Sequence, residues 1–106
     1  MNDNFVAIAN VSDIPDGEAR VFKVEDDISV AVCNLGETFH AIENICSHDD
    51  GPLGEGILIG TEIKCPRHKA RFNVLTGKAT HMPAVAGIQK FPVKVENDTI
   101  FISIDE

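Results

Sequence analysis

The chain has 106 residues, which is the length of one domain and leaves no room for two separate cores. Seventeen acidic residues against nine basic ones give a formal charge of −8, so we expect neither nucleic acid nor an anionic membrane surface as a partner. Three cysteines are too few, and odd in number, for a disulfide framework.

The first forty-odd residues predict a series of strands. Apolar or alternating runs occupy 5–9, 19–24, 28–33 and 38–42, and the signals Asp26-Asp27 and Leu35-Gly36 separate the later ones as turns. Residues 11–16 have room for one short helical turn, and no window of eleven residues has a convincing helical period.

The end of the chain predicts a hairpin. Strands are expected over 87–95 and 99–104, joined by a tight turn at Asn97-Asp98. Between them and the first strands, residues 43–86 are rich in glycine and proline, with short strands such as 57–59 and 62–64. The pattern therefore predicts a single all-β domain, 1–106. Its base comes from about 1–42 and 87–106, and a loop-rich insert spans about 43–86.

Two short motifs lie in that insert. Cys46-Ser-His48 is followed, after sixteen intervening residues, by Cys65-Pro-Arg-His68. Two thiols and two imidazoles in glycine- and proline-containing turns form a metal-ligand pattern. The Cys/His alternation favours two irons, one held by thiolates and one by histidines. Structural zinc more often uses two cysteines and then two histidines, but a zinc site stays an alternative.

With these motifs the chain resembles the Rieske family of [2Fe–2S] proteins. Phe72 and Thr76-Gly77 also stand where the small ferredoxins of that family often carry such residues. The resemblance implies a Rieske-type antiparallel β-sandwich or barrel with a cluster-binding subdomain. It also implies one [2Fe–2S] cluster, with Cys46 and Cys65 on one iron and His48 and His68 on the other. Neutral imidazoles make the oxidised centre less negative than four thiolates would, which raises its potential.

Departures from the high-potential branch of the family predict a low potential. The two cysteines that form a disulfide in that branch are replaced by Gly51 and Arg67. The serine and tyrosine hydroxyls that donate hydrogen bonds near the cluster are replaced by Ala70 and Phe72. Fewer donors stabilise the reduced cluster less, so we expect a potential at the low end of the Rieske range.

Other polar and thiol groups receive simpler predictions. Cys33 stands in a valine-rich stretch without ligand spacing and is expected to be a buried apolar thiol. We expect His40 in a strand facing solvent or in a turn, and His81 in a loop with Met82-Pro83. The two motif loops carry opposite charges. The second loop has basic Lys64, Arg67, Lys69 and Arg71, and the first has Asp49 and Asp50. This pattern predicts a bipolar tip that orients electron-transfer partners.

The predicted function is that of a small soluble one-electron carrier, not an enzyme, because no residues form a nucleophile–base arrangement. The resemblance implies the ferredoxin component of a multicomponent dioxygenase system in aromatic hydrocarbon catabolism. It would carry electrons from a flavin-containing, NAD(P)H-dependent ferredoxin reductase to a terminal oxygenase. The start Met1-Asn2-Asp3-Asn4 lacks a signal-peptide pattern and no apolar run spans a membrane, so we expect a complete cytoplasmic, monomeric protein.

Three alternatives to this carrier remain. The chain could be the small subunit of a nitrite-reductase-like enzyme, although those subunits often lack the four ligands. It could be a zinc-stabilised binding module, or a Rieske domain detached from a larger oxygenase.

Overall fold

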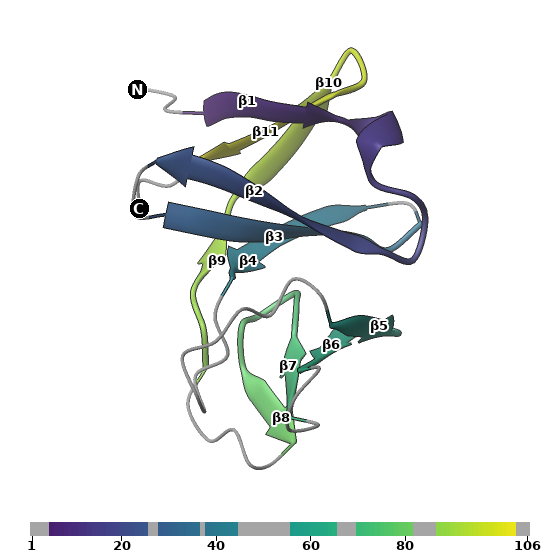
Figure 1. The fold of residues 1–106 in the computed structure, drawn as a ribbon, viewed down its shortest axis with the longest axis vertical. Helices are drawn as coiled ribbons and strands as arrows, with labels where there is room; N and C mark the ends of the chain where they lie inside the picture. The colour runs from purple at the N-terminus through teal and green to yellow at the C-terminus, as the bar shows by residue number, and fades with distance from the viewer. Residues whose placement is uncertain are drawn as a thin grey trace.

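The computed structural model describes residues 5–25, 28–36, 38–44, 56–65, 70–81 and 87–103. Within these ranges the chain forms strands and a single three-residue 3₁₀ helix, which confirms the all-β prediction. No helix in the described ranges is long and apolar enough to cross a membrane. The strands form three antiparallel sheets, which we call A, B and C (Figure 1).

Sheet A joins the two ends of the chain. Its strand order is β1 (Phe5–Asn10), β11 (Thr99–Ser103) and β10 (Val93–Glu96). The turn between β10 and β11 places Asn97 and Asp98 at φ values of 53° and 67°, as a type I′ hairpin turn requires. This confirms the predicted hairpin. The 3₁₀ helix η1 (Val11–Asp13) follows β1 within the predicted helical turn.

Sheet B forms the middle of the molecule. Its order is β2 (Ala19–Glu25), β3 (Ile28–Asn34), β4 (Phe39–Glu43) and β9 (Lys90–Phe91). The prediction of one continuous strand over 87–95 is therefore wrong, because residues 87–89 are not in a strand and the rest is divided at Pro92. Proline has no amide hydrogen to continue a ladder. Phe91 pairs with Ala41 in sheet B, whereas Val93 pairs with Ile102 in sheet A.

Sheet C lies at the opposite end of the long axis from sheet A (Figure 1). Its order is β5 (Ile57–Ile59), β6 (Glu62–Lys64), β7 (Arg71–Asn73) and β8 (Ala79–His81). Strands β7 and β8 were not among the predicted elements. His81 ends β8 opposite Arg71, so its expected place in a loop is wrong.

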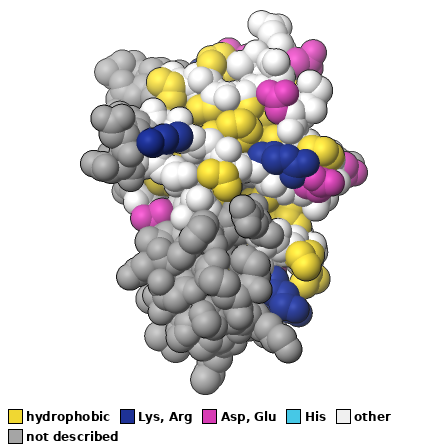
Figure 2. Space-filling view, in the orientation of Figure 1, with side chains coloured by type: hydrophobic (Ala, Val, Ile, Leu, Met, Phe, Trp, Pro, Cys, Tyr) yellow, Lys and Arg dark blue, Asp and Glu magenta, His cyan; other side chains and the backbone are white. Residues whose placement is uncertain are grey.

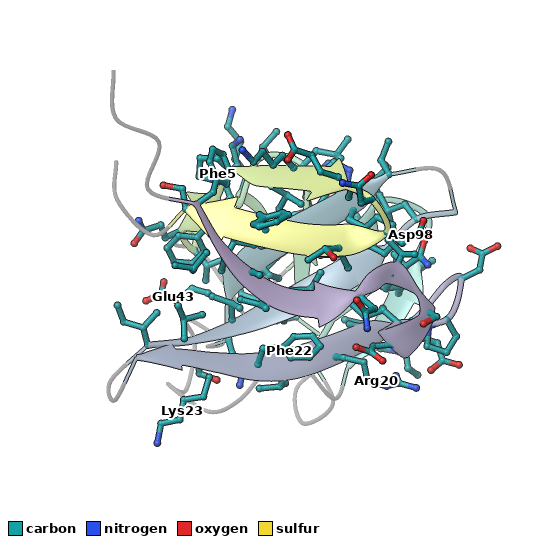
Figure 3. All side chains as sticks on the ribbon, turned by 90° about the horizontal axis from the view of Figure 1, so that it is seen from above. Phe5, Arg20, Phe22, Lys23, Glu43 and Asp98 are labelled. Carbon is teal, nitrogen blue, oxygen red and sulfur yellow. The ribbon has the colours of Figure 1, made fainter. Side chains whose placement is uncertain are left out.

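Two cores lie on the two sides of sheet B. The base core fills the space between sheets A and B, and Figure 3 shows the ring of Phe22, which packs against it, between β2 and β1. The seam core lies between sheets B and C. The base core consists of Ile14, Val30, Val32, Ala41, Phe91, Ile100 and Ile102. The seam core consists of Ala19, Ala31, Cys33, Ile42, Ile63, Cys65, Ala70, Phe72 and Val74.

Strand β3 forms the wall between these cores. Val30 and Val32 point into the base core, and Ala31 and Cys33 point into the seam core. All four side chains are completely buried. A strand buried on both faces needs a continuous apolar sequence, and residues 30–33 supply it.

Candidate metal centre

Cys65 is the one predicted metal ligand that the described residues include. It follows directly after β6, and its side chain is 1% exposed. Its backbone N–H donates to the carbonyl oxygen of Ala70 at 2.7 Å. Cys46, His48 and His68 lie outside the described residues, as do Asp49, Asp50, Gly51, Arg67, Lys69, Met82 and Pro83.

The hairpin of β6 and β7 explains how Cys65 is positioned. Lys64 and Arg71 are register partners at the end of the ladder. The bond from Cys65 to Ala70 extends this pairing by one step and closes the connection that contains residues 66–69. The motif Cys65-Pro-Arg-His68 therefore begins at a fixed point, at the end of a paired strand.

The environment of Cys65 is apolar. Cys65 belongs to the seam core together with Ile63, Phe72 and Val74, each at most 1% exposed. The sulfur is not in a disulfide. A metal-bound thiolate in such surroundings is shielded from water, and cysteine and histidine are suitable donors for iron. The donor set of the two motifs therefore fits an iron–sulfur cluster.

Ala70 and Phe72 follow the second motif on the same hairpin. Both side chains are completely buried in the seam core. Neither has a hydroxyl group, and the Ala70 carbonyl already accepts the Cys65 amide. That amide is thus used within the hairpin, so any N–H donors to the cluster must come from other residues.

Cys33 is a second buried thiol in the seam core, but it belongs to sheet B. It is 0% exposed, and burial raises the pKa of its thiol to about 12. A protonated, apolar thiol is a packing residue rather than a ligand. The prediction of a buried apolar thiol is confirmed.

His40 lies in β4, as predicted, and is half-buried. The Thr38 hydroxyl lies 2.9 Å from its Nε2 atom. Burial, and then the positive charge of Lys90, lower the pKa of this imidazole below its ordinary value. No group of three or more His, Cys, Asp or Glu side chains within the described ranges could hold a metal, so His40 is not part of a second site there.

Arg71 belongs to the predicted basic side of the bipolar tip. Its Nη1 atom lies 3.4 Å from Oε1 of Glu62 on the neighbouring strand. Both side chains are less than a third exposed. Glu62 therefore compensates much of the Arg71 charge locally, an effect that the clustering of basic residues in the sequence does not reveal.

The comparisons with known proteins agree with this geometry. A family model described as "Rieske [2Fe-2S] domain" matches residues 4–92. A Ralstonia protein named as the ferredoxin component of naphthalene 1,2-dioxygenase/salicylate 5-hydroxylase systems is 34% identical, over 99% of this chain and 100% of its own. The 3-phenylpropionate/cinnamic acid dioxygenase ferredoxin subunit of Shigella flexneri is 36% identical, over 97% and 96%.

A solved structure extends the comparison to an assembly. It is titled as a complex of reduced oxygenase and oxidized ferredoxin in carbazole 1,9a-dioxygenase. One of its chains matches with a TM-score of 0.91 and 30% identity, covering 99% of this chain and 97% of that chain.

Proposed function

The chain belongs to the Rieske [2Fe–2S] family, and we propose that it is a one-electron carrier of a ring-hydroxylating dioxygenase system. The observation that carries this function is the full-length match to named ferredoxin components, which leaves no additional catalytic domain unmatched in those relatives. The chain holds one [2Fe–2S] cluster, which supplies one-electron chemistry when bound.

The four ligands are Cys46 and Cys65 on one iron and His48 and His68 on the other. Support comes from the pairing of the two motifs in the sequence and from the placement of Cys65. The paired end of β6 holds the Cys65 backbone, and the seam core keeps water from its sulfur. The base spans about 1–42 and 87–106, and the cluster-binding subdomain about 43–86, all within one domain.

The carrier works between two partners. A flavin-containing, NAD(P)H-dependent reductase supplies the electron, and a terminal oxygenase receives it. The complex of a related ferredoxin with its oxygenase supports the second step. The names of the relatives refer to naphthalene, phenylpropionate and carbazole, so we assign the choice of substrate to the oxygenase rather than to the carrier.

Charge supports a protein partner. On the face shown in Figure 2, the described Lys and Arg side chains stand apart, with acidic side chains among them. This part of the surface offers no continuous basic patch for a nucleic acid. The net charge of −8 favours partners with basic docking surfaces, and we propose a monomer that acts in the cytoplasm.

Purified protein tests the metal assignment. We expect two irons per chain, visible absorption, and a low-temperature EPR signal after reduction. In Cys65→Ser we expect the iron, the visible absorption and the EPR signal to be lost. The far-UV circular dichroism spectrum should still be that of a β protein. A colourless wild-type protein with stoichiometric zinc would favour the zinc-stabilised module instead.

A redox titration tests the low potential. The absent hydroxyls at Ala70 and Phe72 predict a midpoint in the lower part of the roughly −150 to +300 mV Rieske range. A midpoint well above 0 mV would contradict this prediction. The carrier role itself is tested by mixing the protein with a reductase and an oxygenase of this class, because product should then form only when the carrier is present.

A further inference from the structure

Two backbone segments are in contact. One is the turn between β7 and β8, and the other is residues 87–89, which precede β9. Gly77 lies in that turn at φ +82°, and a Cβ atom added there would meet the Ile88 carbonyl oxygen at 2.2 Å. A Cβ atom added to Gly87 would meet the Gly77 carbonyl oxygen at 2.7 Å. The Ile88 N–H donates to that same Gly77 oxygen at 2.7 Å. Only glycine at both positions permits this crossing.

One side of the crossing leads to Cys65. The Gly77 N–H donates to the Asn73 carbonyl at 2.7 Å, and the Asn73 N–H donates to the Lys78 carbonyl at 2.8 Å. Asn73 is the last residue of β7, which pairs with β6. Cys65 stands at the end of β6, so the turn is fixed to the strands that carry the second motif.

The other side leads toward the first motif. The Glu43 N–H donates to the Gln89 carbonyl at 2.8 Å, and the Gln89 N–H donates to Oε1 of Glu43 at 3.3 Å. Glu43 is the last residue of β4, and Cys46 follows only three positions later. Residues 87–89 therefore connect the end of β4 with the β7–β8 turn.

We propose that the Gly77–Gly87 crossing is a positioning device. It fixes the spacing between the two ligand loops, which are the loops that carry Cys46-Ser-His48 and Cys65-Pro-Arg-His68. The inference rests on the proposed cluster, because a two-iron centre shared by two loops requires ligand positions held within about 0.5 Å. Three-residue strands such as β6 and β7 cannot hold such a distance by themselves. The crossing supplies a backbone connection that does not pass through the loops.

Gly17 provides a matched control. It has φ +81°, close to the value at Gly77, but a Cβ atom there would meet nothing within 4 Å. Gly17→Ala therefore introduces the same backbone strain without a clash. Gly87 lies outside the left-handed region, so Gly87→Ala introduces the clash without that strain. Gly77→Ala introduces both.

The experiment compares these three variants with the wild type. In Gly77→Ala and Gly87→Ala we expect altered EPR g-values, a lower midpoint potential and loss of cluster to a chelator about tenfold faster than in the wild type. We expect the lower potential because N–H hydrogen bonds stabilise a reduced cluster, and a changed spacing between its ligands would weaken them. Gly17→Ala should lower the melting temperature while its EPR spectrum and potential stay at wild-type values.

If Gly87→Ala is folded and keeps wild-type g-values, potential and cluster lifetime, the crossing does not position the ligands. The same conclusion follows if Gly17→Ala shifts g-values and potential as much as Gly77→Ala does. Failure of the wild type to bind iron would contradict the proposed function instead. If Gly77→Ala does not fold, Gly87→Ala alone decides the question.

Discussion

The base core and the seam core differ in what they need in order to be stable. The base core lies between sheets A and B, whose strands have four to seven residues, apart from the two-residue β9. The seam core is closed on one side by sheet C, whose four strands have three residues each. It also contains Cys65, a proposed cluster ligand.

This difference links metal binding to one part of the molecule. Short strands contribute few hydrogen bonds, so we expect the stability of sheet C to depend on burial against sheet B and on the bound cluster. The base core has no proposed ligand and gains no such support. The base is therefore expected to survive changes that separate sheet C from its cluster.

Truncation of Phe72 is expected to have the largest effect on the seam core. Phe72→Ala leaves a cavity in the seam core, at a cost of roughly 3–5 kcal/mol. During denaturant titration we expect the visible absorption of the cluster to disappear before the far-UV signal of the base.

The matched change in the base is Ile100→Ala, which costs about 2–5 kcal/mol. Ile100 is equally buried, but it belongs to the base core. Here the visible and far-UV transitions should move together to lower denaturant. Coincident transitions in Phe72→Ala as well would show that the two cores unfold as one unit.

Substitutions of Cys33 are expected to have a smaller effect on the seam core. Cys33→Ser places a hydroxyl among apolar side chains, so we expect it to lower the free energy of unfolding by about 1–3 kcal/mol. Cys33→Ala should cost less, because it introduces no polar group. Iron analysis should still give two irons per chain in each variant, whereas a loss of iron in the alanine variant would make Cys33 a ligand.

The pH dependence of His40 gives the smallest effect. Because the pKa of His40 lies below its ordinary value of 6.5, the unfolded chain binds its proton more readily than the folded protein does. This contribution to stability is present above pH 6.5 and is lost as the pH falls through the lowered pKa. In denaturant titrations from pH 7 to 5, the free energy of unfolding should fall more steeply in the wild type than in His40→Gln. Equal slopes would contradict the lowered pKa.

Elements with a strong local signal were predictable from the sequence. The valine-rich stretch at 28–33 predicted β3, and Asn97-Asp98 predicted the final hairpin, because in each case neighbouring residues determine the structure. The short strands β7 and β8 have too few residues for a period to be recognised. Pro92 was visible in the sequence, but the exchange of partners at that point depends on contacts with distant strands.

The motifs of the candidate site could be predicted from the sequence, but the contacts that hold the surrounding backbone in place could not. Cys65 was recognisable from the spacing to His68 and from the matching first motif. Gly77 and Gly87 are ten positions apart, and no local rule brings their backbones into contact. Similarly, the ion pair of Arg71 with Glu62 appears only when β6 and β7 are paired.

The pairing of β1 with β11 also bears on the order in which the chain acquires structure during translation. Phe5 is the register partner of Ser103, so sheet A cannot close until nearly the whole chain has left the ribosome. Strands β5 to β8 are sequence neighbours and pair in chain order, so their loop-closure entropy is small. The hairpin of β6, which precedes the proposed ligand Cys65, and β7, which follows it, can therefore form before β1 finds its partner in sheet A.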